Sequence, residues 1–146
     1  MEIIVDTRER YAWKFTTQQA TTTRQALKVG DYGVKVDDEL VAVIERKSLT
    51  DFASSLTSGR LEYRLAELEQ VLHAVVLVED RYSAIFKLGH VRSAVVADML
   101  AECQVRHPTV PIIFAETRAL AQEWAYRYFR AAVRDRQQAD ESVTRW

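Results

Sequence analysis

The stretch LVAVIERK, Leu40 to Lys47, begins as an unbroken apolar run and ends in three consecutive charged residues. Short apolar runs that are rich in β-branched residues are typical of strands buried inside a sheet. Because side chains alternate along a strand, Glu45 and Lys47 share one face and Arg46 points to the other. The stretch therefore predicts an acid and an amine side by side at the end of a buried strand.

Shorter strands are predicted on the N-terminal side of this stretch. Glu2 to Asp6 is a β-branched run that ends in an acid, and Thr21 to Leu27 and Gly33 to Val36 have a strand-like composition. The turns Gly30-Asp31-Tyr32 and Asp37-Asp38 contain residues that favour chain reversal. We expect these segments to form a hairpin-like meander.

Helices and strands alternate on the C-terminal side. The runs AVVLV, Ala74 to Val78, and VPIIF, Val110 to Phe114, are typical of buried strands. Helical spacing of apolar residues predicts helices over Thr50 to Leu56, Arg60 to Leu72 and Val91 to Val105. This alternation is typical of parallel strands joined by crossover helices. The sequence thus predicts an α/β fold with a central mixed sheet flanked by helices.

Two of these helices carry apolar stripes that predict core residues. The spacing selects Leu61, Leu65, Leu68 and Leu72 in the first, and Val95, Met99 and Cys103 in the second. On this stripe Cys103 is interpreted as a core residue and not as a nucleophile.

A last helix is predicted from about Thr117 to Arg136, and residues 137–146 are expected to form a flexible tail. Its apolar residues cover an arc wider than half of the helix circumference. They are Leu120, Ala121, Trp124, Ala125, Tyr128, Phe129, Ala132 and Val133. One contact with a sheet would not cover this arc, so we expect a second protein partner on it.

The composition limits the possible classes of protein. A chain of 146 residues that is 48% hydrophobic fits one domain, residues 1–146. A lone cysteine and three well-separated histidines exclude an internal disulfide and a cysteine-based zinc site. With no membrane-spanning run and no signal peptide, we expect a soluble intracellular protein of the cytoplasm, nucleoid or nucleus. The net charge of -1 means that any nucleic acid must be bound by local clusters of cations.

The end of the LVAVIERK strand predicts a site for chemistry if the turn at Asp31 lies beside it. Asp31 and Glu45 would then converge next to Lys47, a set that suits Mg²⁺ or Mn²⁺ and phosphodiester hydrolysis. In that arrangement Lys47 would orient a water molecule or stabilise developing charge. Taken alone, neighbouring Glu and Lys residues on a strand are also typical of a surface ion pair.

The order of these residues resembles a known family. Gly30-Asp31-Tyr32 followed by Ile44 to Asp51 (IERKSLTD) resembles the GDX(n)ERKX(3)D signature of the XPF/Hef structure-specific endonucleases. Val5 to Glu9 (VDTRE) is similar to the family's opening element, and Ser55 to Leu61 (SLTSGRL) resembles its helix junction. The resemblance runs from about Val5 into the last helix and implies a restriction-endonuclease-like fold in a stand-alone form, without the helix-hairpin-helix module of many members.

The resemblance also implies roles for individual residues. The implied catalytic residues are Asp31, Glu45, Lys47, Arg46 and Asp51. The implied metal ligands are Asp31 and Glu45, with Asp6 as a third acid, and the implied DNA contacts are Arg8 and Arg60. Two alternatives stay open: a buried ion pair of Arg46 with Glu9 or Asp51, and a helix N-terminal role for Asp51. Arg64 stands where related sequences tend to have a glutamine.

The implied activity is hydrolysis of DNA phosphodiester bonds with Mg²⁺ or Mn²⁺, on branched, flap or fork DNA. The implied partners are DNA and a second subunit, in a homodimer or a heterodimer with a nuclease partner, through Trp124, Tyr128 and Phe129 of the last helix. The alternatives are a catalytically silent DNA-binding or scaffold subunit of a nuclease dimer, and a restriction-like nuclease with another substrate.

Overall fold

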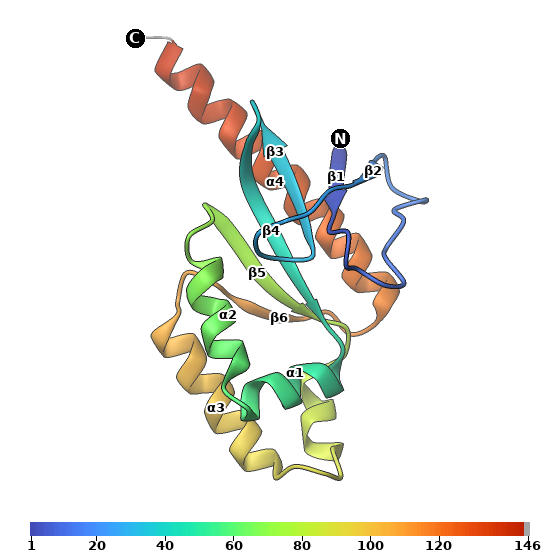
Figure 1. Cartoon of the computed structure of the whole chain (residues 1–146), viewed down its shortest axis with the longest axis vertical. Coiled ribbons are helices and arrows are strands. Elements are labelled where there is room, and N and C mark those ends of the chain that lie inside the picture. Colours follow the sequence, from blue (N-terminus) through green and yellow to red (C-terminus); the bar gives the residue numbers. More distant parts are fainter. Residues whose placement is uncertain (145–146) are drawn as a thin grey trace.

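The computed structural model describes residues 1–144 and is built around a six-stranded mixed sheet (Figure 1). The strand order is β2-β1-β3-β4-β5-β6. The strands are β1 (Glu2–Val5), β2 (Thr21–Arg24), β3 (Tyr32–Val36), β4 (Glu39–Lys47), β5 (His73–Val78) and β6 (Ile112–Phe114). This architecture confirms the predicted α/β fold with a central mixed sheet.

The LVAVIERK stretch forms the longest strand, β4, at the centre of the sheet. β3 and β4 pair antiparallel through a turn in which Asp37 and Asp38 have φ of 50° and 64°, the backbone that tight hairpin turns need. On its other side β4 pairs in parallel with β5, which pairs in parallel with β6. The predicted hairpin and the predicted parallel half of the sheet are therefore both confirmed, and they meet at β4.

The predicted meander is wrong for β2. This strand pairs with β1 in parallel at the edge of the sheet, with Glu2 opposite Thr21. A parallel pairing needs a connection of about a dozen residues or more, and the segment between the two strands, residues 6–20, provides it. Its sequence TTTR is mostly exposed, as is usual for an edge strand.

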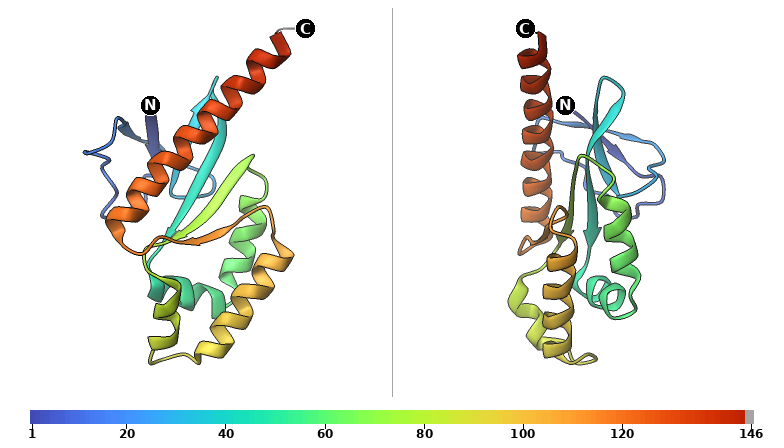
Figure 2. Two further views of the ribbon diagram at one scale, coloured as in Figure 1. Left: turned by 180° about the vertical axis from the view of Figure 1, so that it is seen from behind. Right: turned by 90° about the vertical axis from the view of Figure 1, so that its left-hand side faces the viewer.

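Helices cover both faces of the sheet (Figure 2). They are α1 (Leu49–Thr57), α2 (Arg60–Leu68), α3 (Ser93–Arg106) and α4 (Arg118–Thr144), with a 3₁₀ helix η1 (Tyr82–Lys87) before α3. α4 packs with Ile3, Ile44 and Leu77 on one face, and α1 to α3 share a second core with Val43 and Val76 on the other.

Two predicted core positions are wrong. α2 ends at Leu68 and not at Leu72, which is 60% exposed after the helix has stopped. In α3 the buried residue is Val96, whereas Val95 is 41% exposed. Since α3 packs on α1 and η1 rather than flat on the sheet, its buried face is rotated from the predicted stripe. Cys103 is buried and unpaired, as predicted.

α4 is longer than predicted, because it continues from Arg118 to Thr144 instead of ending near Arg136. Most of the residues expected to form a tail are therefore helical, and residues 145 and 146 lie outside the described part of the chain. Within residues 1–144 no helix combines the length and the apolar character that crossing a membrane requires.

The apolar arc of α4 divides into two parts. Ala121, Ala125 and Phe129 are fully buried against the sheet. Trp124 and Tyr128 are only half-buried and stack on each other with ring centroids 5.1 Å apart. Phe129 therefore belongs to the core of this chain and cannot supply a surface for a partner, which corrects that part of the prediction.

Candidate active site at the end of β4

Asp31 reaches the end of β4 because Gly30 allows a sharp approach of the two segments. Gly30 has φ of +84°, and a Cβ there would lie 3.0 Å from the Cβ of Val43. The Asp31 N–H then donates to the Ile44 carbonyl over 2.8 Å. In return the Arg46 N–H donates to Asp31 Oδ2 over 2.8 Å. The predicted proximity of Asp31 to the ERK segment is thus what the structure shows.

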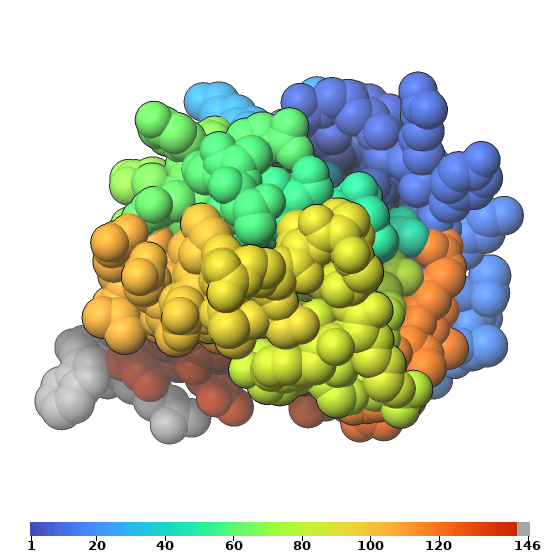
Figure 3. All heavy atoms as spheres, turned by 90° about the horizontal axis from the view of Figure 1, so that it is seen from below, coloured from blue at the N-terminus to red at the C-terminus, as the bar shows by residue number. Residues whose placement is uncertain are grey.

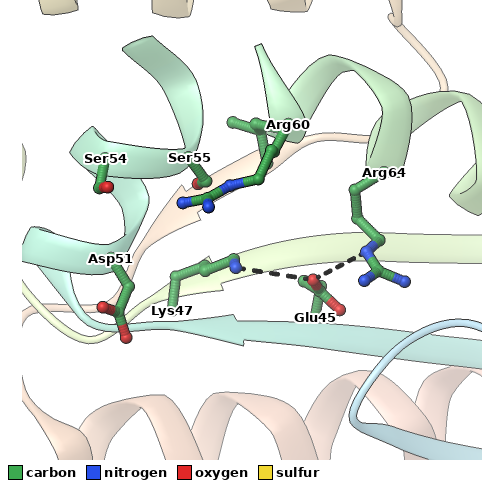
Figure 4. Close-up of a pocket in the computed structure, with 8 residues that line it drawn as sticks. Glu45, Lys47, Asp51, Ser54, Ser55, Arg60 and Arg64 are labelled. Atoms are coloured by element: carbon green, nitrogen blue, oxygen red, sulfur yellow. Dashed lines mark ion pairs between the residues drawn. The ribbon is translucent and has the colours of Figure 1, made fainter. Parts of the chain in front are cut away.

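Glu45 and Lys47 share one face of β4, as the alternation of strand side chains predicts. Lys47 Nζ lies 3.8 Å from Glu45 Oε2. Arg64 of α2 approaches the same oxygen, with its Nε at 3.3 Å (Figure 4). Glu45 is buried, and so the two cations compensate part of the cost of burying its charge. Arg64 was noted in the sequence only as a departure from related proteins.

The two carboxylates lie in an environment that disfavours their charge. Burial, together with the nearby Glu45 carboxylate, raises the pKa of Asp31 to about 7. Burial also raises the pKa of Glu45, although Arg64 and Lys47 attract its charged form. A divalent cation between two such acids would reverse both shifts, because it favours the ionised carboxylates.

Arg46 points to the opposite face, again as predicted. Its guanidinium forms ion pairs with Glu9 and with Glu79 at the end of β5, and it lies 5.2 Å from the ring centre of Trp13. The Arg46–Glu9 distance is 3.1 Å. Of the two alternatives considered for a buried ion pair, the structure therefore contains Glu9 and not Asp51. Glu79 could have been anticipated as the residue that follows β5, parallel to β4.

Asp6 is buried near this end of the sheet, but its carboxylate is already used. Oδ1 accepts from the Leu27 N–H at 2.8 Å, and Oδ2 accepts from Arg8 Nε at 2.9 Å. Burial alone would raise the pKa of Asp6, yet these hydrogen bonds hold it below its ordinary value. Because both oxygens of Asp6 already accept hydrogen bonds, Asp6 is a poorer candidate for a metal ligand than Asp31. Arg8, whose side chain is 72% exposed, forms an ion pair with Asp6.

Asp51 and Arg60 lie at the border of the site. Ser48 caps α1 by accepting from the Asp51 N–H at 3.2 Å, so Asp51 occupies the first turn, where an acid interacts favourably with the helix dipole. Arg60 begins α2 and is exposed. Both residues line the hollow that Lys47 and Arg64 also line, and the Arg60 side chain extends across it (Figure 4).

These residues line two adjoining hollows of about 200 and 280 Å³ that share Glu45, Lys47, Asp51 and Arg64. Asp31 lines the second of them. Seen from below, this surface lies between the N-terminal segment in blue and α2 in green (Figure 3). We call the two adjoining hollows together the cleft. Both carboxylates and cations line it.

Two carboxylates that line the cleft, Asp31 and Glu45, could hold a metal ion. Among residues 1–144 no group of three Asp, Glu, His or Cys side chains is arranged to hold an ion. Mg²⁺ is commonly bound by one or two carboxylates, with water and substrate phosphates as its other ligands. Asp31 and Glu45 therefore satisfy the protein's share of such a site.

Comparison with models of protein families shows to which family the chain belongs. The model of the ERCC4 domain matches residues 5–128. The chain belongs to the ERCC4 domain family. The XPF-type family predicted from Gly30 to Asp51 is thereby confirmed. One curated relative, a putative ATP-dependent RNA helicase of Methanocaldococcus jannaschii, is 35% identical over 79 residues. The aligned residues are 54% of this chain and 10% of that relative, so this chain spans about a tenth of the relative's length.

Solved structures show the same ERCC4-type fold. XPF from Aeropyrum pernix is similar with a TM-score of 0.77 at 20% identity, over 97% of this chain and 69% of that one. XPF from Aeropyrum pernix in complex with DNA has a TM-score of 0.70 at 19% identity, over 94% of this chain and 66% of that one. At this identity the likeness establishes the fold, and it confirms the predicted architecture.

Asp31→Asn is expected to change how stability depends on pH. In the metal-free wild type the folded-state pKa of Asp31, about 7, lies above the ordinary value of 3.8 for an aspartate. The folded state thus binds a proton more tightly, and stability falls as pH rises from about 4 to about 7. Asp31→Asn removes this loss and should stabilise the protein by about 1–3 kcal/mol at pH 8, with little effect at pH 4. Urea unfolding in EDTA measures it.

Asp38→Asn is the matched control, because the Asp38 side chain is 99% exposed. It should leave the pH profile of the wild type unchanged. A profile of Asp31→Asn that runs parallel to the wild type from pH 4 to pH 8 would contradict the raised pKa of Asp31.

Proposed function

We propose that this chain is a metal-dependent endodeoxyribonuclease that hydrolyses DNA phosphodiester bonds at Asp31, Glu45 and Lys47. Membership of the ERCC4 domain family supports a DNA nuclease. The proposal rests on one observation. The carboxylates of Asp31 and Glu45, both with a raised pKa, lie beside the Lys47 amine at the end of β4. Titratable groups perturbed by burial and by one another, inside a cleft, are typical of catalytic sites.

Asp31 and Glu45 would hold Mg²⁺ or Mn²⁺, both of which prefer oxygen ligands. The bound ion supplies a Lewis acid that polarises a phosphoryl oxygen and lowers the pKa of a coordinated water molecule. The two side chains would contribute their ionised forms, and the hydrogen bond from the Arg46 N–H would keep Asp31 Oδ2 oriented. Asp6 is not included, because its oxygens are already occupied.

Lys47 would act on the substrate phosphate or on the attacking water. Its side chain is 23% exposed and lines both hollows of the cleft. An ammonium held at this position can orient the water molecule or stabilise the negative charge that develops on the phosphate. Its 3.8 Å contact with Glu45 fixes that position.

The neighbouring residues would position the reacting groups. Arg46 is a positioning residue in this proposal, because its guanidinium is engaged by Glu9 and Glu79 on the far face of β4. Arg60 would contact a DNA phosphate from the rim of the cleft, and Arg8 would do so beside Asp6. Asp51 lines the cleft near Lys47 and remains a candidate for a supporting catalytic acid.

The substrate proposed is branched DNA, such as a flap or a fork. Support comes from the family and from a structural relative solved in complex with DNA. The cations around the cleft, Lys47, Arg60 and Arg64, suit contacts with the phosphate backbone rather than with base edges. With a net charge of -1 for the whole chain, this local cluster would provide the attraction for DNA.

A catalytically silent subunit is the second candidate, and one observation favours it. Arg64 Nε lies 3.3 Å from Glu45 Oε2, so a fixed positive charge already neutralises one of the two proposed metal ligands. A metal ion would have to displace this guanidinium or tolerate its repulsion. A subunit in which Arg64 has replaced the ion would bind DNA without cutting it.

We also propose that the exposed part of the α4 arc pairs with another subunit, in a homodimer or with a nuclease partner. Leu120 is 48% exposed beside the stacked rings of Trp124 and Tyr128. A hollow of about 290 Å³ is lined by Leu120, Trp124 and neighbouring residues. An apolar strip of this kind on a helix is typical of a subunit contact.

Asp31→Ala and Lys47→Ala are expected to abolish DNA cleavage. Labelled flap, fork and duplex DNA would be incubated with each protein and Mn²⁺ or Mg²⁺, and products separated on denaturing gels. The wild type should cut the branched substrates, and each variant should be slower by at least about 100-fold because a metal ligand or the charge-stabilising amine is lost.

Asp38→Ala and Lys87→Ala remove exposed residues of the same types away from the cleft and should cut like the wild type. Cleavage that survives in Asp31→Ala would contradict the proposed site. Absence of cleavage by the wild type, together with no metal-dependent rise in melting temperature, would favour the silent subunit.

Arg64→Gln is expected to strengthen metal binding. Removing the guanidinium next to Glu45 removes a repulsion between like charges, which should raise the apparent affinity for Mn²⁺ by about 10-fold. The rise in melting temperature with increasing Mn²⁺ reports this affinity without any need for activity. Arg134→Gln, on the exposed side of α4, serves as the control. Equal Mn²⁺ affinities for wild type and Arg64→Gln would show that Arg64 does not compete with the ion.

Trp124→Glu is expected to convert a dimer into a monomer. Light scattering coupled to size-exclusion chromatography measures the mass in solution, and a charge placed in the apolar strip should prevent association. Arg134→Glu is the control on the exposed side of the same helix. A wild-type chain that stays monomeric at about 100 μM would rule out the homodimer. Dimers with an interface of ordinary size form well below that concentration.

A further inference from the structure

Tyr11 is held in an unusual way for a surface residue. Its side chain is 87% exposed, while its backbone has φ of 52°, which residues other than glycine adopt rarely. Two arginines fix that backbone: Arg46 Nη1 donates to the Tyr11 carbonyl at 3.1 Å, and Arg118 Nη2 donates to the same oxygen. Rare conformations that the surrounding structure enforces are concentrated at functional sites.

The two other aromatic rings of the loop after β1 are buried. Trp13 and Phe15 are 2% and 1% exposed and pack in the core beside Tyr32. The loop therefore turns two rings inward and presents the third, Tyr11, to solvent on a fixed backbone. Because the Tyr11 ring buries almost none of its surface, packing of the ring does not explain why the backbone of Tyr11 is held in this conformation.

Tyr11 borders a separate cavity of about 670 Å³, between the loop, β1, the edge strand β2 and the start of α4. Its volume is within the range of about 300–1,000 Å³ that is usual for small-molecule sites. Three cations line it, Lys14, Arg24 and Arg118, and none of its lining residues in the described chain is acidic. Figure 3 shows the start of α4 in orange directly beside the blue N-terminal segment.

We propose that this cavity binds a single-stranded segment of DNA, with a base stacked on Tyr11 and phosphates on Lys14, Arg24 and Arg118. Exposed aromatic rings that alternate with cations are how proteins bind single strands without reading their sequence. The proposal rests on the proposed nuclease function, which it refines. A duplex keeps its bases stacked on one another, so this site selects an unpaired arm.

The position of the cavity relative to the cleft agrees with this assignment. Asp6 and Glu9 line the cleft, whereas Tyr11 lines the cavity, so residues 6–11 form the wall between the two. Arg24 Nη1 donates to the carbonyls of Asp6 and Glu9 at 3.3 and 2.8 Å and supports that wall from the cavity side. A strand cut in the cleft can continue over this wall onto the Tyr11 ring.

The test measures binding in EDTA, so that no cleavage can occur. Fluorescence anisotropy would compare binding of labelled dT20 with binding of a 20-base-pair duplex. Tyr11→Ala is expected to weaken dT20 binding by about 5- to 100-fold, the usual effect of losing one stacked base, and duplex binding by less than about twofold. Tyr11→Phe keeps the ring and should bind like the wild type. Tyr63→Ala is the matched control, a tyrosine 79% exposed outside the cavity.

A second measurement does not depend on the affinity of a variant. Irradiation of wild type bound to an oligonucleotide with 5-iododeoxyuridine should cross-link the peptide that contains Tyr11, as identified by mass spectrometry. Unchanged dT20 binding by Tyr11→Ala, an equal loss in Tyr63→Ala, or cross-links confined to other peptides would overturn the proposal. Tighter binding of rU20 than of dT20 would overturn its assignment to DNA. Because no step requires cleavage, a failed nuclease assay would leave these outcomes distinguishable.

Discussion

The guanidinium of Arg46 is the interaction on which the arrangement of this domain depends. It joins three segments: β4 itself, the loop after β1 through Glu9, the Tyr11 carbonyl and the ring of Trp13, and Glu79 after β5. The two acids are only 14% and 11% exposed, so removing the arginine would leave Glu9 without its ion pair and Glu79 with only the longer contact to Arg118. These segments can therefore come together only when β4 is in its observed register.

That constraint on one face of β4 also fixes the chemistry on the other. Because Arg46 is anchored among Glu9, Glu79 and Trp13, strand alternation forces Glu45 and Lys47 toward α2. The Arg46 N–H then orients Asp31. A slip by one residue would exchange the two faces, burying Lys47 where Arg46 lies and losing the cleft. The proposed positioning role of Arg46 and the proposed catalytic roles of Glu45 and Lys47 thus fall on consecutive residues of one strand.

Two aspartates at this end of the sheet, Asp6 buried and Asp31 half-buried, differ in how their carboxylates are satisfied. Asp6 accepts hydrogen bonds on both oxygens, and its pKa is lowered. Asp31 has one oxygen bonded to a backbone N–H and lies near another carboxylate, and its pKa is raised. The first acid is satisfied by the fold alone, whereas the second gains from an added cation. This difference supports the proposal that Asp31 and Glu45, rather than Asp6, would hold a metal ion.

The sequence predicted what depends on local pattern. Alternation along LVAVIERK gave the two faces of β4, and the apolar runs at β5 and β6 gave the parallel half. It did not predict contacts that tertiary packing decides. The four polar residues of β2 carry no signal for pairing with β1 rather than β3, and the approach of Arg64 to Glu45 depends on how α2 is placed. Similarly, the choice of Val96 over Val95 follows from packing of α3 on α1.

The loop after β1 links these separate features. The Tyr11 carbonyl and the inward Glu9 carboxylate both bind Arg46, so the wall of the cleft and the backbone that carries the Tyr11 ring are held by the same side chain. In a chain with a net charge of -1, attraction for a polyanion has to come from cations gathered in hollows, where the field is focused. Here two such hollows lie on either side of one fixed loop. In the proposed function, this arrangement would orient a bound strand through backbone contacts alone.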